Sequence, residues 1–122
     1  MNPKHFVLLY VAEPAASARF YEKLLGRPPV ESSPTFAMFA LSEGLMLGLW
    51  SRQTVEPPPK AQPGASELCL ALPGDGEVDA AHARWRELGV PIAQPPTRMD
   101  FGYTCVGLDP DGHRLRAFAP AG

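Results

Sequence analysis

The sequence contains little cysteine, little net charge and no long apolar run, and each of these absences excludes a class of protein. Two cysteines, Cys69 and Cys105, are too few for a disulfide framework, so we expect a reduced chain in the cytoplasm, with a single bridge between them as the alternative. A net charge of −2 leaves no basic stripe for nucleic acid. No apolar stretch reaches the roughly 20 residues of a membrane span, and we expect neither a membrane partner nor a signal peptide.

The residues that are present predict a folded domain with an internal repeat. A hydrophobic content of 45% suffices for the core of one domain of 122 residues. A β-type apolar run predicts a strand at residues 6–11, and helical spacing predicts a helix at 14–25 that ends at Gly26. Two further strands are predicted at 35–41 and 45–50.

The second half repeats this order of elements. A strand is predicted at residues 67–72, then a Gly-Asp-Gly loop, then a helix at 77–88. Two strands follow at 101–108 and 113–118. They are joined by the tetrapeptide DPDG at 109–112, where Pro suits the second position of a turn and Gly supplies a positive φ.

One strand of each half is less clear. Short edge pieces broken by prolines are expected at residues 29–31 and 92–93. The proline-rich segment 53–65 predicts a linker. The expected fold class is therefore α+β, a single domain of residues 1–122 built from two βαβββ modules, 1–52 and 66–122. The alternative is a generic α+β domain whose halves look alike by chance.

Two motifs in opposite halves resemble a known superfamily. Residues 17–26 read SARFYEKLLG, similar to its S-x-x-F-Y-x-x-x-L-G helix, and residues 109–113 read DPDGH, similar to its D-P-D-G-[HNY] turn. The chain thus resembles the vicinal-oxygen-chelate superfamily, which includes glyoxalase I, extradiol dioxygenases, and fosfomycin and bleomycin resistance proteins. The resemblance spans nearly the whole chain and implies paired βαβββ modules that form a curled mixed sheet, usually in a homodimer.

A closer resemblance is to the phenazine-antibiotic-resistance proteins of that superfamily. Residues 8–10 (LLY), 13–17 (EPAAS), 49–51 (LWS) and 101–104 (FGYT) are similar to segments of those proteins. This resemblance implies sequestration of a planar aromatic antibiotic without chemistry.

The positions at which metal-dependent members of the superfamily hold their metal carry unsuitable residues here. The resemblance places these ligands on the first and last strands of each module, at Phe6, Gly48, Glu67 and Arg116. A divalent metal needs a lone pair or a negative charge, which only Glu67 offers, while Arg116 would repel the cation. We therefore expect no metal and no cofactor.

The three histidines do not restore a metal site. His5 is one residue from Phe6, so strand periodicity turns it to the opposite face. His82 lies on the second predicted helix and His113 follows the DPDG turn. None of them forms a cluster with ligand spacing.

Glu67 and Arg116 remain as a pair of opposite charges at the vacated position. One interpretation is a buried ion pair that only fills the site, which would contribute little to stability. The other is that Arg116 binds a carboxylate or phenolate of a ligand through its guanidinium fork, with Glu67 keeping it oriented. Glu67 would be a poor general base, because Arg116 holds its pKa low.

Alternation along the strands predicts a largely aromatic cavity. Phe6, Leu8 and Tyr10 should point into it, and Gly48 should leave open volume beside Trp50. The predicted ligand-binding residues are Tyr10, Phe36, Met38, Trp50, Glu67, Cys69, Tyr103, Arg116 and Phe118.

Some of these assignments have simpler alternatives. For Phe6, Phe36 and Phe118 a role as ordinary core is the favoured interpretation, and Trp85 has the helical spacing of a core residue. Cys105 is expected on the cavity side together with Tyr103. No cysteine has a positioned base that would activate it.

Three functions follow from these observations. We predict metal-independent binding of a planar aromatic small molecule, as in antibiotic resistance of the phenazine or bleomycin type. The alternative is a metal-dependent enzyme of the glyoxalase or dioxygenase kind, a lyase or oxidoreductase. A third hypothesis is a scaffold whose cavity is filled by its own side chains.

Overall fold

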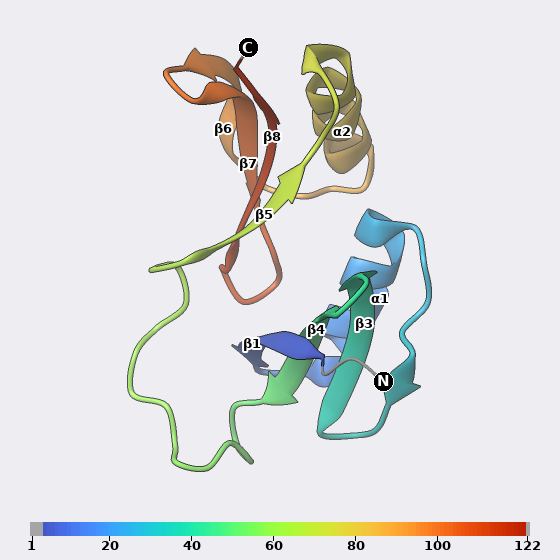
Figure 1. The fold of residues 1–122 in the computed structure, drawn as a ribbon. Helices are drawn as coiled ribbons and strands as arrows, with labels where there is room; N and C mark the ends of the chain where they lie inside the picture. Colours follow the sequence, from blue (N-terminus) through green and yellow to red (C-terminus); the bar gives the residue numbers. More distant parts are fainter. Residues whose placement is uncertain (1–3, 122) are drawn as a thin grey trace. The chain divides into compact units, whose positions relative to one another are not determined.

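The computed structural model describes residues 4–121 and divides the chain into two compact units, residues 1–62 and 63–122. Each unit contains one helix and one four-stranded mixed sheet (Figure 1). The first contains β1 (His5–Val11), α1 (Pro14–Leu25), β2 (Glu31–Ser32), β3 (Phe36–Ser42) and β4 (Leu45–Ser51). The second contains β5 (Glu67–Ala71), α2 (Asp75–Glu87), β6 (Ile92–Met99), β7 (Gly102–Leu108) and β8 (Arg114–Pro120). The predicted α+β class and the repeated βαβββ order are confirmed.

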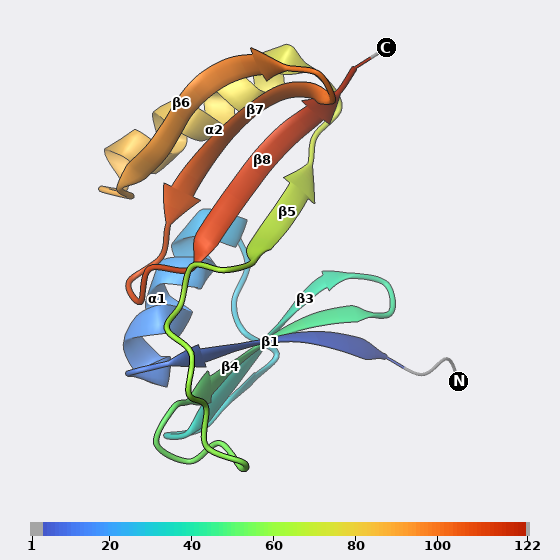
Figure 2. The same ribbon diagram turned by 90° about the vertical axis from the view of Figure 1, so that its left-hand side faces the viewer.

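The two sheets have the same topology. Their strand orders are β1-β4-β3-β2 and β5-β8-β7-β6, so the first strand of each module pairs in parallel with the last, and the other pairs are antiparallel. Helix α1 contacts β3 and β4, and α2 contacts β6, β7 and β8 (Figure 2). Each module therefore has one sheet face covered by its own helix and a second face that this helix leaves uncovered, here called the helix-free face.

Strand β1 illustrates how alternation assigns side chains to these faces. Leu9 and Val11 are buried on the side of α1, whereas Phe6 and Leu8 remain 47% and 42% exposed on the helix-free face. The prediction for β1 is confirmed. The exposure of Phe6 also excludes the interpretation that it is an ordinary core residue.

Helix α1 begins and ends where the sequence indicates. Pro14 occupies its first turn, where the missing N–H is not needed. Gly26 has a φ of 72° and donates its N–H to the carbonyl of Glu22 at 2.9 Å. The buried side of the helix carries Tyr21, whose ring centroid is 6.4 Å from that of Phe39 on β3.

Helix α2 begins two residues earlier than predicted. Gly74 is extended and precedes the helix, so Asp75 belongs to the first turn and not to a loop. The acidic Asp75 and Glu77 suit this position because the helix dipole places positive charge there. Val78 and Trp85 are buried against the sheet, which confirms Trp85 as a core residue.

The edge strands differ most from expectation. Strand β6 extends over residues 92–99 and not only 92–93, even though it contains Pro95 and Pro96. It tolerates them because it lies at the sheet edge and its pairing with β7 is interrupted between Gln94 and Thr97. Strand β2 is as short as predicted but begins at Glu31.

The predicted DPDG turn between β7 and β8 is confirmed. Gly112 has a φ of 93°, and its N–H binds the carbonyl of Asp109 at 3.0 Å. The Asp109 carboxylate accepts the backbone N–H groups of Asp111 and His113, both at 2.9 Å. Within residues 4–121 no helix is both long enough and apolar enough to cross a membrane.

Candidate functional site

The helix-free face of the first module carries a pocket lined almost entirely by apolar side chains. Phe6 and Leu8 of β1, Phe36 of β3 and Trp50 of β4 line a volume of about 420 Å³, here called the aromatic pocket. This volume lies within the roughly 300–1,000 Å³ of typical ligand sites.

Strand register explains why these residues meet. Tyr10 and Phe36 are both paired with Trp50, and Met38 is paired with Gly48. All five positions therefore share the helix-free face. The ring of Tyr10 meets that of Trp50 edge to face, with centroids 6.2 Å apart. Tyr10 and Met38 thus lie beside the aromatic pocket, whereas Phe36 and Trp50 line it.

The expectation that Gly48 leaves open volume is wrong. A β-carbon at this position would lie 2.7 Å from Leu8 Cδ2 and 2.9 Å from Phe36 Cζ. These two side chains occupy the space above the glycine and form the floor of the aromatic pocket. The absence of a side chain at Gly48 lets them approach the sheet.

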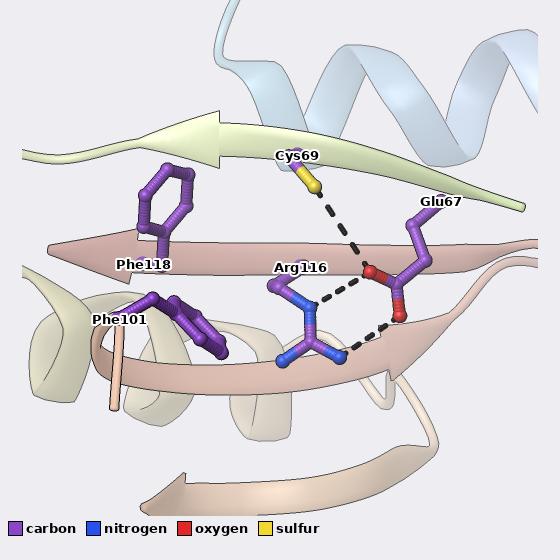
Figure 3. A pocket seen from close by; sticks show the side chains of 5 residues that line it. All are labelled: Glu67, Cys69, Phe101, Arg116 and Phe118. Carbon is purple, nitrogen blue, oxygen red and sulfur yellow. Dashed lines mark hydrogen bonds and ion pairs between the residues drawn. The ribbon is translucent and has the colours of Figure 1, made fainter. Parts of the chain in front are cut away.

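The helix-free face of the second module carries a pocket of different chemistry. Its volume is about 380 Å³. It contains a thiol, a carboxylate, a guanidinium and two phenyl rings, and we call it the charged pocket (Figure 3). Its lining residues are Glu67, Cys69, Phe101, Arg116 and Phe118.

The two phenyl rings and the guanidinium form one continuous surface. Phe101 and Phe118 meet edge to face with centroids 6.1 Å apart, and the guanidinium carbon of Arg116 lies 5.8 Å from the Phe101 centroid. Cys69 Sγ donates a weak hydrogen bond to Glu67 Oε1 at 4.0 Å. Neither cysteine of the chain is in a disulfide.

Arg116 and Glu67 form a two-point ion pair. Arg116 Nε and Nη2 donate to the two carboxylate oxygens of Glu67 at 2.8 and 2.9 Å. This hydrogen bonding is the main reason why the pKa of Glu67 is lowered, and the same contact raises the pKa of Arg116. The Glu67 side chain is 24% exposed and the Arg116 side chain 15%, so the pair is only partly buried.

A second arginine contacts the same carboxylate. Arg114 Nη2 lies 2.8 Å from Glu67 Oε2. Two guanidinium groups therefore share one carboxylate, and the cluster carries a net charge of +1. Arg114 lies two residues before Arg116 on β8 and so shares its face, but the sequence did not indicate this contact.

The expectation that Tyr103 and Cys105 face the ligand side is wrong. Strand β7 pairs them with Ala119 and Ala117, which turns both toward α2. There the Tyr103 hydroxyl donates to Asp79 Oδ1 at 2.7 Å, which raises the pKa of the phenol. Cys105 is fully buried, and this burial raises the pKa of its thiol.

Two residues of the charged pocket region were missed. Thr104 takes the place expected for Tyr103: it is buried, and its hydroxyl accepts a hydrogen bond from Arg116 Nη1 at 3.1 Å. Phe101 precedes β7 and is 45% exposed. Its isolated aromatic side chain beside Gly102 was the available signal, but its contact with Phe118 depends on how the strands pair.

The residues at the superfamily's metal positions do not fit a metal ion. Phe6 lines an apolar pocket, and Gly48 is covered by two apolar side chains. Both carboxylate oxygens of Glu67 already accept hydrogen bonds from Arg116. Among residues 4–121 no group of three or more His, Cys, Asp or Glu side chains is arranged to hold one. His5 lies one position from Phe6 on β1 and so faces the other way, as predicted.

Comparison with known proteins agrees with this architecture. The chain is 31% identical to the phenazine antibiotic resistance protein EhpR of Enterobacter agglomerans, over 89% of this chain and 85% of that protein. It is 50% identical to protein ATC0852 of Agrobacterium tumefaciens, whose solution structure superposes with a TM-score of 0.88 over 100% of both chains. A glyoxalase-related enzyme from Fulvimarina pelagi shares the fold at 24% identity, with a TM-score of 0.85 over 100% of this chain and 94% of that one.

The superfamily assignment rests on nearly the whole sequence. Residues 3–117 match the family described as the Glyoxalase/Bleomycin resistance protein/Dioxygenase superfamily. The two sheets of β1-β4-β3-β2 and β5-β8-β7-β6 order provide the corresponding fold. The chain therefore belongs to the glyoxalase/bleomycin resistance/dioxygenase superfamily.

Proposed function

We propose that this protein binds a planar aromatic small molecule without a metal ion and that it acts by sequestration, as in resistance to a phenazine-type or bleomycin-type antibiotic. The observation that carries the proposal is the replacement of the superfamily's metal ligands by pocket-forming groups. Phe6 lines the aromatic pocket, and Gly48 leaves room for the side chains at its floor. Glu67 and Arg116 form an ion pair in the charged pocket.

The side chains of both pockets suit a flat, largely apolar ligand. Trp50 and Phe36 offer ring surfaces in the aromatic pocket, and Phe101 and Phe118 offer them in the charged pocket. Contacts between aromatic rings contribute about 0.5–1.5 kcal/mol beyond the burial of apolar area. The similarity to a phenazine antibiotic resistance protein supports a ligand of this class.

The alternative of a metal-dependent enzyme has less support from the residues. A catalytic metal needs several protein ligands and an open coordination position. Of the four superfamily positions only Glu67 carries a ligating group, and its two oxygens already accept hydrogen bonds from Arg116. A likeness of fold to glyoxalase-related enzymes does not supply the missing ligands.

Fluorescence titration tests the proposal directly. Trp50 lines the aromatic pocket, whereas the other tryptophan, Trp85 of α2, is buried between this helix and its sheet. Addition of phenazine-1-carboxamide or a related planar compound should quench the emission with micromolar or stronger affinity. In Trp50→Phe most of the quenching should disappear, because the remaining Trp85 is buried and offers no surface to a ligand.

Calorimetry and elemental analysis complete the test. Arg116→Ala should weaken binding, while Arg98→Gln serves as the matched control, because Arg98 also pairs with a carboxylate and lies over a ring, but on the α2 side of the sheet. If no planar aromatic compound binds, the proposal is wrong. Stoichiometric metal whose chelation abolishes a measured activity would establish the enzyme instead.

Two predictions about the setting of this function accompany the proposal. The superfamily resemblance implies a homodimer, which sedimentation velocity at several protein concentrations would detect. The two cysteines outside disulfides agree with a reducing compartment, and we propose the cytoplasm. Fractionation of cells that express the tagged full chain would test this location.

A further inference from the structure

The two arginines that contact Glu67 differ in how many of their hydrogen-bond donors are in use. Arg116 donates to both oxygens of Glu67, and its Nη1 donates to Thr104 Oγ1 at 3.1 Å and to Gln94 Oε1 at 3.3 Å. A guanidinium has five N–H groups. Four of those of Arg116 are therefore engaged, including the Nε–Nη2 edge that would otherwise bind a carboxylate in two-point fashion.

This occupancy changes the role expected for Arg116. A ligand carboxylate could reach the fork only by displacing Glu67, whose oxygens lie at 2.8 and 2.9 Å. The sequence-based interpretation in which Arg116 binds the acidic edge of a ligand is therefore not supported. Arg116 is instead a fixed cationic wall of the charged pocket, and its neighbouring surface is the Phe101 ring.

Arg114 is the arginine with donors to spare. Within residues 4–121 its one acceptor is Glu67 Oε2, and its Nε is buried without a hydrogen-bond partner. Its side chain is 41% exposed, compared with 15% for Arg116. The buried Nε is out of reach of a ligand, but the guanidinium end of this 41% exposed side chain retains N–H groups beyond the one that contacts Glu67. Arg114 does not line the charged pocket itself, but it contacts Glu67, which does, so these N–H groups lie next to the pocket.

The charge of the cluster indicates the kind of acceptor. Arg114 and Arg116 together carry two positive charges, and Glu67 compensates one of them. The remaining charge of +1 attracts an anion of one charge. A doubly charged phosphate would be less fully compensated and would be repelled by Glu67 more strongly than a carboxylate is.

We infer that Arg114 is the specificity-determining residue for an aromatic ligand that carries a single carboxylate. The ring lies in the charged pocket beside Phe101, Phe118 and Arg116, and the carboxylate accepts hydrogen bonds from the spare donors of Arg114. This inference rests on the proposed function, because it assumes that the pocket accepts an aromatic molecule.

Two isosteric probes test the inference. Phenazine-1-carboxylic acid and phenazine-1-carboxamide have the same ring system and differ in charge. The wild-type protein should bind the acid about 5- to 10-fold more tightly than the amide by calorimetry, as expected for a hydrogen bond between charged groups. In Arg114→Gln this preference should fall to about one, with the amide bound as before. In the wild type, high salt should reduce the ratio of the affinity for the acid to that for the amide, because salt screens the attraction between the carboxylate and the arginines.

Control variants separate Arg114 from its neighbours. Arg116→Gln should weaken both probes, because it removes a wall of the pocket, and should weaken the acid more, because the net charge of the cluster falls from +1 to zero. Arg98→Gln on the other face should change the binding of neither probe. Arg114→Lys should restore part of the preference, because it keeps the charge without the planar fork. Thermal unfolding of each variant verifies that it is folded.

The possible outcomes distinguish the two proposals. Equal binding of acid and amide by the wild type, or a preference that survives in Arg114→Gln, overturns the role of Arg114 and leaves the proposed function standing. Absence of binding of either probe to the wild type contradicts both.

Discussion

Phe36 covers Gly48 so closely that a β-carbon on residue 48 would lie 2.9 Å from Cζ of the phenyl ring. The glycine sits on the central strand β4 at a superfamily metal position, and the ring comes from the neighbouring strand β3. Leu8 and Phe36 can therefore form the floor of the aromatic pocket only because residue 48 has no side chain. A side chain introduced at this position would have to displace the end of Leu8 and the ring of Phe36.

Gly48→Ala should destabilise the protein by about 1–3 kcal/mol, because the methyl group overlaps Leu8 and Phe36. Urea-induced unfolding measures the change.

Phe36→Leu, combined with Gly48→Ala, should recover part of the lost stability if the phenyl ring is the group that clashes. A double-mutant cycle measures this recovery. Gly76→Ala is the matched control: no atom lies within 4 Å of a β-carbon at this helical position, so this variant should gain about 0.5–1 kcal/mol. Equal stability of Gly48→Ala and wild type would contradict the packing described here.

Glu67→Gln should cost about 2 kcal/mol, because it replaces a partly buried carboxylate that is shared by Arg114 and Arg116 and leaves two like charges together. The same chemical change at the exposed Glu22 of α1 provides the control and should stay within about 0.5 kcal/mol. Chemical denaturation of both variants gives the comparison. If Glu67→Gln lowers the free energy of unfolding no more than Glu22→Gln does, the ion pair does not stabilise the fold.

The contribution of Glu67 should depend on pH with a defined sign. Its pKa is lower in the folded protein than in the unfolded chain, chiefly through the hydrogen bonds from Arg116. The stabilisation is therefore complete above the unfolded pKa of about 4.3 and is lost as the pH falls through the folded pKa. The difference in unfolding free energy between wild type and Glu67→Gln should be constant near neutral pH and shrink toward about pH 3. A difference that grows on acidification would rule out this assignment.

The two cysteines should differ in reactivity toward a thiol reagent. Cys69 is exposed in the charged pocket, whereas Cys105 is fully buried and its burial raises the pKa of its thiol. The native protein should consume one equivalent of Ellman's reagent and the denatured protein two. Cys69→Ser should abolish the reaction of the native protein. A ligand in the charged pocket should slow the reaction of Cys69, which therefore reports binding in this pocket, whereas Trp50 emission reports binding in the aromatic pocket.

The sequence was sufficient for features that depend on local pattern. Alternation in β1 placed Phe6 and Leu8 opposite Leu9 correctly, because this strand pairs with β4 without interruption. The ends of α1 followed from Pro14 and Gly26. The pairing of Glu67 with Arg116 was also predicted, because the superfamily resemblance placed both residues at one vacated metal position.

Features that depend on pairing between strands were less accessible. The register of β7 against β8 determines that Thr104, and not Tyr103, faces Arg116, and the sequence carries no local mark of that register. The second contact of Glu67, with Arg114, requires the side-chain directions in three dimensions. Strand β6 is longer than its two prolines indicate, because an edge strand needs fewer N–H donors than an inner strand.

Those prolines have a consequence for self-association. Strand β6 is an outer strand of the second sheet, and Pro95 and Pro96 remove two successive donors from its backbone. An incoming strand from another molecule would find no regular ladder along that side. The edge is thereby protected against the strand-by-strand growth that leads to fibrils, at a position where a regular apolar sequence would invite it.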